Sequence, residues 1–227
     1  MSEKALLAWS SGKDSAWALH VLRQQGEVEV VGLLTTLNEA FDRVAMHAVR
    51  AALLRAQAEA ADLPVTTVPL PWPCSNAQYE AAMGAALAAA ASTGITVVAF
   101  GDLFLEDVRR YREERLADTG LRPAFPLWGE PTEALARRMI EGGLRARLTC
   151  VDPRQVPAAF AGREFDDALL ADLPPGADPC GEHGEFHSFA YAGPMFSRPV
   201  PVRSGEVIER DGFVFADLLP VAGPAAT

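Results

Sequence analysis

Six consecutive residues near the start of the chain have the composition of an anion-binding turn: Ser10-Ser11-Gly12-Lys13-Asp14-Ser15. They follow an apolar run, Ala5 to Trp9, and precede a segment of helical pattern from Ser15 to about Gln24. A turn from a buried strand into a helix aims free backbone N–H groups and the positive end of the helix dipole at one point. Lys13 adds a charge and the serines add hydroxyl donors. We therefore predict a phosphate-binding loop, with Asp14 or Ser15 capping the helix.

The loop differs from two common phosphate-binding motifs. A Walker loop ends in Gly-Lys-Ser/Thr, whereas the order here is Gly12-Lys13-Asp14, and the run does not fit the Gly-x-Gly-x-x-Gly dinucleotide pattern. An ordinary strand-to-helix turn is the alternative, and the loop alone leaves both interpretations open. A serine at position 11 suits a backbone N–H donor only if the turn does not need a positive φ there.

A second polar cluster occupies residues 178–189, with the sequence Asp-Pro-Cys-Gly-Glu-His-Gly-Glu-Phe-His-Ser-Phe. Glu182, Glu185 and His187 could bind a metal, orient an amine or exchange protons. Its glycines let the backbone pass close to a ligand. The spacing matches no standard zinc motif, and a solvated loop without a chemical role is the alternative.

The elements that must position these two stretches alternate between strand and helix patterns. We predict strands at 5–9, 28–36, 65–70 and 95–100, and helices at 15–24, 44–61, 76–91 (capped by Asn76) and 105–119. This alternation predicts an α/β fold, a Rossmann-like parallel sheet with helices on both faces. Ligands bind at the carboxyl ends of such strands, so the Ser-rich loop, Thr35-Thr36 and Gly101-Asp102 should meet at one edge.

The last third of the chain has a different pattern. It gives a weak strand at 123–128, a helix at 132–142, a strand at 144–152, a Pro- and Gly-rich region at 174–184, and hairpin-like segments at 199–203 and 205–215. We place a boundary near residues 120–130 and expect a smaller α+β domain after it.

Composition narrows the class of protein. The 227 residues are 49% hydrophobic, which is sufficient for a full core. The net charge of −10 argues against nucleic acid as a partner, because that needs a basic surface. The start of the chain has no signal-peptide pattern, and no apolar stretch could span a membrane. Three distant cysteines, Cys74, Cys150 and Cys180, do not suggest a disulfide framework, so we expect a cytoplasmic protein.

With both polar stretches in view, the chain resembles the diphthine–ammonia ligase family, a branch of the N-type ATP pyrophosphatases in the adenine-nucleotide α-hydrolase-like superfamily. The resemblance rests on Ser10–Ser15, Met46-His47, Phe100-Gly101-Asp102, Glu106-Asp107, Arg109, Glu113, Pro126-Leu127-Trp128 and Gly181–His187. The superfamily loop is usually Ser-Gly-Gly-x-Asp-Ser, so Ser11 replaces a glycine. The closing motif is usually Gly-Glu-Asn-Gly-Glu-Phe/Tyr-His-Thr, so His183 replaces Asn and Ser188 replaces Thr.

The resemblance implies an ATP-dependent amide ligase. Residues 1–125 would form an ATP-binding PP-loop domain and residues 126–227 a smaller substrate-binding domain. Such an enzyme uses ATP and Mg²⁺, transfers AMP to a carboxylate with release of pyrophosphate, and lets ammonia displace the AMP. Diphthine occurs in archaea and eukaryotes, whereas the Ala- and Arg-rich composition is typical of a GC-rich bacterial genome. We therefore expect a different carboxylate, on a small molecule or a modified protein residue.

The resemblance also implies roles for individual residues. The catalytic set is Lys13, Asp14, Glu182, Glu185 and His187, with Asp14 also on the metal. The nucleotide-binding set is Ser10, Ser11, Gly12, Lys13, Asp14, Ser15, Leu34, Thr35, Thr36, Gly101 and Asp102. The substrate-binding set is His47, Arg109, Glu113, Gly181, Glu182, Glu185 and His187.

Two rival functions remain open at this point. One is a tRNA-modifying ATP pyrophosphatase, which the acidic composition and the unpaired cysteines disfavour. The other is a non-catalytic adenine-nucleotide-binding protein, which would not need Lys13, Asp14 or Glu185. Free ammonia is the simpler nitrogen source, because no glutaminase domain is visible in the sequence. The oligomeric state stays open, with a homodimer as one alternative.

Overall fold

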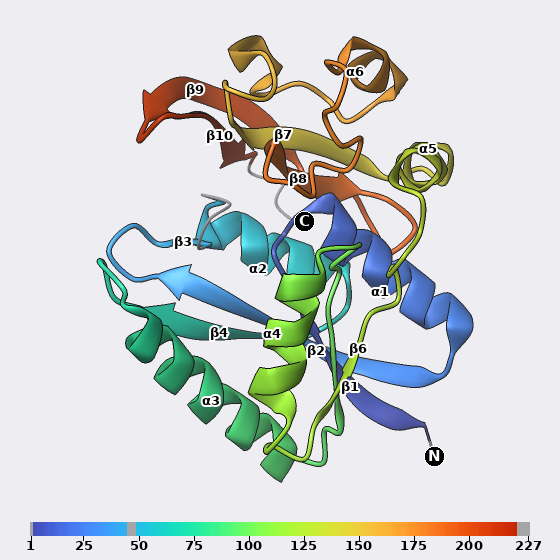
Figure 1. The fold of residues 1–227 in the computed structure, drawn as a ribbon, viewed down its shortest axis with the longest axis vertical. Helices are drawn as coiled ribbons and strands as arrows, with labels where there is room; N and C mark the ends of the chain where they lie inside the picture. Colours follow the sequence, from blue (N-terminus) through green and yellow to red (C-terminus); the bar gives the residue numbers. More distant parts are fainter. Residues whose placement is uncertain (1, 45–48, 222–227) are drawn as a thin grey trace, which may run out of the picture.

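A computed structural model describes residues 2–44 and 49–221, and it arranges them around two β-sheets (Figure 1). The first sheet contains β1 (Glu3–Ala8), β2 (Val28–Asn38), β3 (Arg43–Val44), β4 (Val65–Leu70), β5 (Val97–Ala99) and β6 (Arg122–Ala124). The second contains β7 (Arg145–Val151), β8 (Phe186–Ala192), β9 (Val202–Arg210) and β10 (Phe213–Pro220). The helices are α1 (Lys13–Gln25), α2 (Ala51–Ala60), α3 (Asn76–Ser92), α4 (Glu106–Leu116), α5 (Thr132–Glu141) and α6 (Asp167–Asp172), with a 3₁₀ turn at Ala158–Phe160.

The first sheet is parallel except for the short strand β3. β1 pairs with β2 on one side and β5 on the other, β4 extends the sheet beyond β2, and β6 extends it beyond β5. The strand order reverses at β1, which makes its carboxyl end the topological switch point where ligands bind in such sheets. The Ser-rich loop leaves the sheet at this point.

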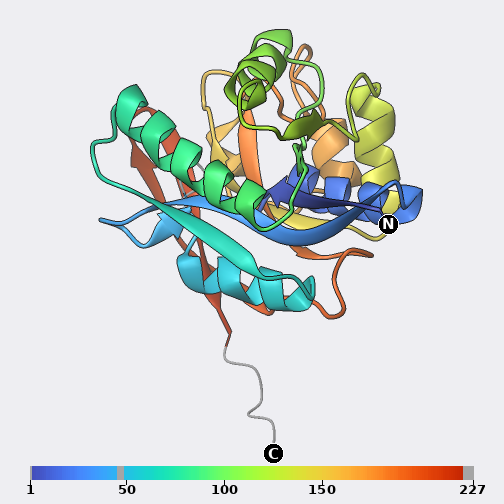
Figure 2. The ribbon, with the colours of Figure 1, turned by 90° about the horizontal axis from the view of Figure 1, so that it is seen from below.

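Helices cover both faces of this sheet, as the alternating pattern predicted. In β1, Ala5 and Leu7 belong to the hydrophobic cluster that holds the buried residues of α1 and α2, whereas Leu6 belongs to the cluster under α3 and α4. This is the period-2 alternation of a strand buried on both sides. Figure 2 shows α2 on one side of the sheet and α3 and α4 on the other.

The second sheet is antiparallel, with the strand order β8-β7-β10-β9. Leu148 and Phe189 of this sheet belong to the same hydrophobic cluster as Leu7 and Leu19 of the first sheet and α1. The expected α/β fold with a smaller second α+β region is therefore confirmed, and one continuous core joins the two sheets.

Three helix starts differ from the prediction. The N-cap residue of α1 is Gly12, which has no side chain to cap the helix. Asp14 and Ser15 cannot be the N-cap, because both lie inside the helix. Ser75, rather than Asn76, caps α3 in a capping box with Gln78. The helix predicted over 44–61 begins only at Ala51, because Val44 pairs with β2 instead.

The end of the polar cluster and the C-terminal segments also differ from the expectation. Residues 186–192 form strand β8 along β7, so the last four residues of the cluster 178–189 lie on a strand and not in the solvated loop that was the alternative. The segments expected at 199–203 and 205–215 are bounded differently: β9 runs from Val202 to Arg210 and β10 from Phe213 to Pro220, with the turn between them at Asp211-Gly212. Within residues 2–44 and 49–221, no helix is long and apolar enough to cross a membrane.

Candidate active site

The Ser-rich loop is an internally hydrogen-bonded turn. The Ser10 hydroxyl lies 3.1 Å from the Ser15 hydroxyl and accepts from the backbone N–H of Gly12 at 3.2 Å. The backbone N–H of Lys13, an orphan donor at the helix start, donates to Ser188 Oγ on β8 at 3.2 Å. Residues of the second sheet thus help to hold the first turn of α1.

Ser11 adopts the left-handed conformation, with φ of +69°. The turn therefore does require a positive φ at the position where the family pattern has glycine. The Ser11 hydroxyl is buried and has no hydrogen-bond partner among the described residues. Its backbone carbonyl accepts from the Ala190 N–H at 3.0 Å and from the side chain of Gln57 at 3.0 Å. The conformation is thus fixed through the main chain.

Lys13 is buried, with 2% of its surface exposed, and its ammonium group contacts both polar stretches. Nζ donates to the two carboxylate oxygens of Asp14 at 2.9 and 2.8 Å and to the backbone carbonyl of Cys180. The rings of Phe165 and Phe186 each lie 5.5 Å from Nζ. Burial is the largest influence and would lower the pKa of Lys13, but Asp14 together with Cys180 and Glu182 outweighs it, and the pKa lies above its usual value. The amine therefore stays charged.

The segment 178–185 turns around the side chain of Asp178. Its Oδ2 accepts from the backbone N–H groups of Cys180 and Glu182, at 3.2 and 2.9 Å. The Asp178 N–H in turn donates to Glu185 Oε1 at 2.8 Å. Glu185 is only 1% exposed, and its other oxygen has no partner among the described residues. Gly181 has a φ of +71°, and a Cβ there would lie 2.9 Å from the Phe186 carbonyl oxygen.

Glu182 in this segment and His187 just after it have strongly shifted pKa values. Glu182 accepts from the Leu103 N–H at 2.8 Å, which joins the segment to the loop after β5. Burial, reinforced by the negative charge of Asp14, raises the pKa of Glu182 to about 7 in spite of that hydrogen bond. Burial and the charge of Lys13 lower the pKa of His187 to about 4. A carboxyl that titrates near neutrality is suited to proton transfer.

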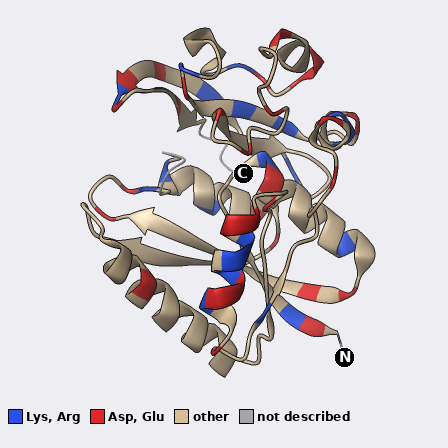
Figure 3. Ribbon diagram, in the orientation of Figure 1, with Lys and Arg blue, Asp and Glu red and all other residues tan. Residues whose placement is uncertain are grey.

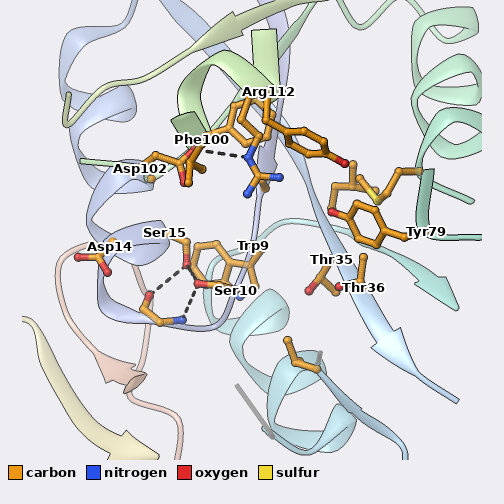
Figure 4. Close-up of a pocket in the computed structure, with 18 of the residues that line it drawn as sticks. Trp9, Ser10, Asp14, Ser15, Thr35, Thr36, Tyr79, Phe100, Asp102 and Arg112 are labelled. Carbon is orange, nitrogen blue, oxygen red and sulfur yellow. Dashed lines mark hydrogen bonds and ion pairs between the residues drawn. The ribbon is translucent and has the colours of Figure 1, made fainter. Parts of the chain in front are cut away.

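Both polar stretches line one large cavity of about 970 Å³. Figure 4 shows Ser10 and Ser15 at one end, Tyr79 at the other, and the guanidinium of Arg112 pointing into the space between them. Thirteen of the predicted site residues line it: Ser10, Gly12, Lys13, Asp14, Ser15, Leu34, Thr35, Thr36, Gly101, Asp102, Gly181, Glu182 and His187. The expected convergence at the carboxyl edge of the sheet is present in the structure.

Comparison with known families accounts for both halves of the chain. Residues 3–123 match the diphthamide synthase N-terminal domain, and residues 131–216 match the diphthamide synthase C-terminal domain. The chain belongs to the diphthamide synthase family. Among its curated relatives, the diphthine–ammonia ligases of Homo sapiens and Bos taurus are 32% and 31% identical to it over 124 residues. This stretch is 52% of the chain and 45% of each relative, so the match spans about half the length of these proteins.

Four predicted site residues lie outside the cavity lining of this family member. Ser11 and Glu185 are buried behind it. On α4, Arg109 pairs with Glu113 at 2.8 Å and lies over the ring of Trp128 at 4.8 Å. Figure 3 shows how densely charges of both signs cover α4. His47, together with Met46, lies outside the described residues.

Two side chains near the loop were not in the predicted site. Arg112 lies one turn beyond Arg109 on the cavity side of α4, over the ring of Phe100 at 5.0 Å, and its Nε is 3.5 Å from Asp102 Oδ2. Its signal in the sequence was its place after Gly101-Asp102, which singled out Arg112 together with Arg109 and Glu113 from the charged run, although only the latter two were assigned a role. Gln57 gave no signal, because a lone glutamine on a helix is usually exposed.

The donor set at the cavity is compatible with Mg²⁺ in the form in which proteins usually bind it with nucleotides. Asp14 lines the wall with a side chain that is 27% exposed, and Asp102 and Glu182 line it as well. Residues 2–44 and 49–221 contain no group of three or more His, Cys, Asp or Glu that could hold a metal alone. Mg²⁺ commonly needs only one or two carboxylates, because substrate phosphates and water supply the other oxygens.

Proposed function

We propose that this protein is an ATP-dependent amide ligase that adenylates a carboxylate and then aminates it with ammonia. The observation that carries the proposal is the convergence of the loop before α1 and the 180–188 segment on one cavity. Family membership and relatives named diphthine–ammonia ligase support the same class of reaction.

The nucleotide is proposed to bind along the carboxyl edge of the first sheet. Ser10, Gly12 and Ser15 would hold the pyrophosphate part, next to the positive end of α1. Leu34, Thr35, Thr36, Gly101 and Asp102 would line the adenosine part. A Cβ on Gly101 would lie 3.0 Å from the backbone of Asp14 and Ser15, so any other residue there would push the start of α1 away by a few tenths of an ångström.

The chemistry follows from the charges that surround this position. A carboxylate oxygen attacks the α-phosphorus, the bond to the bridging oxygen breaks, and pyrophosphate leaves with the electron pair. The charged Lys13 stabilises the negative charge that develops on the leaving group. Mg²⁺, held by Asp14 and the phosphates, would neutralise further charge there.

The second half-reaction uses the 180–188 segment. Ammonia adds to the acyl carbon, the acyl–oxygen bond breaks and AMP leaves. The nitrogen must lose a proton, and Glu182, with a pKa of about 7, is the proposed acceptor. His187 is neutral at pH 7 and is proposed to orient the amine. Arg112, which points into the cavity, is suited to an anionic oxygen of the acyl-adenylate.

The decisive experiment identifies the products made from ATP labelled at the α and γ phosphates. Purified protein is incubated with Mg²⁺, ammonium and a pool of metabolite carboxylates. Release of AMP and pyrophosphate that needs a carboxylate and disappears in Lys13→Ala supports the proposal, and fractionating the pool leads to the substrate. ADP and phosphate as products would refute it. AMP release that needs tRNA instead of a carboxylate would favour the tRNA-modifying alternative.

A further inference from the structure

A buried glutamine on α2 holds the Ser-rich loop from behind. Gln57 is 0% exposed, although it is polar and lies in a hydrophobic core. Its Oε1 accepts from the indole Nε1–H of Trp9 at 3.0 Å. Since an indole nitrogen can only donate, this contact fixes which end of the Gln57 amide faces Trp9.

The other end of the amide contacts two backbone carbonyls. Nε2 donates to the Ser11 carbonyl at 3.0 Å and to the Ala190 carbonyl at 2.6 Å. Both N–H groups of the amide are therefore used, and the side chain links the segment after β1, the loop and strand β8 of the second sheet. A network that is satisfied in this way specifies one arrangement of the segments that it joins.

Ser11 is the member of this network that needs support. Its φ of +69° is unfavourable for a residue with a Cβ, by about 1 kcal/mol or more. The Ser11 hydroxyl has no partner among the described residues, so the side chain does not compensate this cost. Its carbonyl is held by Gln57 Nε2 and by the Ala190 N–H. Gly12 and Lys13, which follow directly, line the cavity.

We propose that Gln57 is a positioning residue of the phosphate loop, whose side-chain amide holds Ser11 in its left-handed conformation. The direction in which the chain enters α1 depends on that conformation, and with it the position of the N–H groups of Gly12 and Lys13. The ligand readout below rests on the proposed function, whereas the backbone readout does not.

The test measures the binding of ATP with Mg²⁺, and of inorganic pyrophosphate with Mg²⁺, by titration calorimetry. Gln57→Leu removes both donors and the acceptor, and we expect it to weaken binding of each ligand by at least tenfold. Gln24→Leu makes the same exchange on the exposed end of α1. Leu121→Ala destabilises the core at the amino end of β6, away from the cavity lining. Both controls should bind within threefold of wild type.

A rescue experiment separates positioning from general stability. Glycine adopts positive φ without a Cβ penalty, so Ser11→Gly should compensate for the lost support. We expect this change to improve binding at least fivefold more in Gln57→Leu than in the wild-type background. Equal effects in the two backgrounds would overturn the proposal. If Gln57→Leu does not fold, Gln57→Glu replaces it. This variant keeps the acceptor for Trp9 but sets a carboxylate oxygen against the two carbonyls.

Amide hydrogen exchange tests the role of Gln57 even if the protein binds no nucleotide. Amide hydrogen exchange of a peptide covering residues 10–16 should be at least tenfold faster in Gln57→Leu than in Leu121→Ala. Wild-type protein that binds neither ATP nor pyrophosphate, combined with faster exchange in Gln57→Leu, refutes the proposed function and supports the role of Gln57. Unchanged exchange in the loop refutes the role of Gln57 whatever the ligand data show.

Discussion

Glu182 should make the stability of the protein fall as the pH rises through neutrality. Its pKa is about 7 in the folded chain, whereas 4.5 is the reference value. The folded state therefore holds a proton that the unfolded state has lost between these two values. A raised carboxyl pKa gives its full stabilisation below pH 4.5 and loses it as the pH passes 7. Replacing Glu182 by glutamine should remove this dependence.

The structure gives the size of the effect. A shift from 4.5 to about 7 corresponds to about 3 kcal/mol at 1.36 kcal/mol per unit. Glu182 is partly exposed, so solvent screening reduces this to about 1.5 kcal/mol. The Leu103 N–H keeps its acceptor in Glu182→Gln, because the amide oxygen can take the place of Oε1. At pH 8 the variant should therefore be about 1.5 kcal/mol more stable than wild type.

The assay is urea unfolding of wild type and Glu182→Gln at pH 5 and pH 8. The free energy of unfolding of Glu182→Gln should exceed that of wild type only slightly at pH 5, and the difference should grow toward pH 8. Glu114→Gln removes the same charge from an exposed position on α4 and corrects for the net charge of −10. If the advantage of Glu182→Gln is no larger at pH 8 than at pH 5, or if Glu114→Gln shows the same trend, the carboxyl at 182 does not hold its proton as argued.

Three further predictions concern the loop and the closing segment. Ser11→Gly should raise the free energy of unfolding by about 1 kcal/mol, because it relieves the positive φ and removes a buried hydroxyl without a described partner. A decrease in urea unfolding would contradict this. Gly181→Ala should cost about 2 kcal/mol more than Gly184→Ala. Both positions have positive φ, but only a Cβ at 181 meets the Phe186 backbone, and equal losses would refute the clash. Lys13→Met should lower the rate of AMP release at least 100-fold, because in the proposed mechanism its buried charge stabilises the leaving group. A fold-change under ten in a folded variant would remove Lys13 from the chemistry.

The parts of the fold that the sequence predicted are those in which local pattern and tertiary contacts agree. β1, β2 and β4 follow apolar or β-branched runs, which are typical of strands in such a sheet, although β4 lies at its edge with only Val68 and Leu70 buried. The rule that strand ends meet at one edge then placed the loop, Thr35-Thr36 and Gly101-Asp102 around one cavity. No knowledge of side-chain contacts was needed for that step.

The errors arose where a distant contact outweighed the local pattern. Val44 continues the helical spacing of α2, but it pairs with Leu37 of β2. Residues 186–192 have a loop-like composition at their start, yet they pair along β7. The C-terminal hairpin turns at Asp211-Gly212, a residue pair typical of hairpin turns, inside the segment 205–215 that was expected to be hairpin-like.

The site residues missed by the sequence analysis share a physical reason. Gln57 matters because of Trp9, Ser11 and Ala190, and these partners are between 46 and 133 positions away in the chain. Arg112 follows Gly101-Asp102 and was weighed with its helical neighbours Arg109 and Glu113, but only the packing of α4 shows that Arg112 lines the cavity whereas Arg109 does not. The role of Gln57 could not be read from residue types and spacing.

The Ser-rich loop is built from both halves of the chain, although its sequence motif lies entirely in the first. The second half supplies the Ser188 hydroxyl to the Lys13 N–H, the Ala190 N–H to the Ser11 carbonyl, and the Cys180 carbonyl to Lys13 Nζ. Cys180 lies in the turn before β8, and Ser188 and Ala190 lie on β8 itself. A change in the 180–190 region is therefore transmitted to the loop through hydrogen bonds to its backbone and to Lys13. The two half-reactions of the proposed ligase would share one rigid framework, so acyl transfer could take place without moving the acyl-adenylate between separate sites.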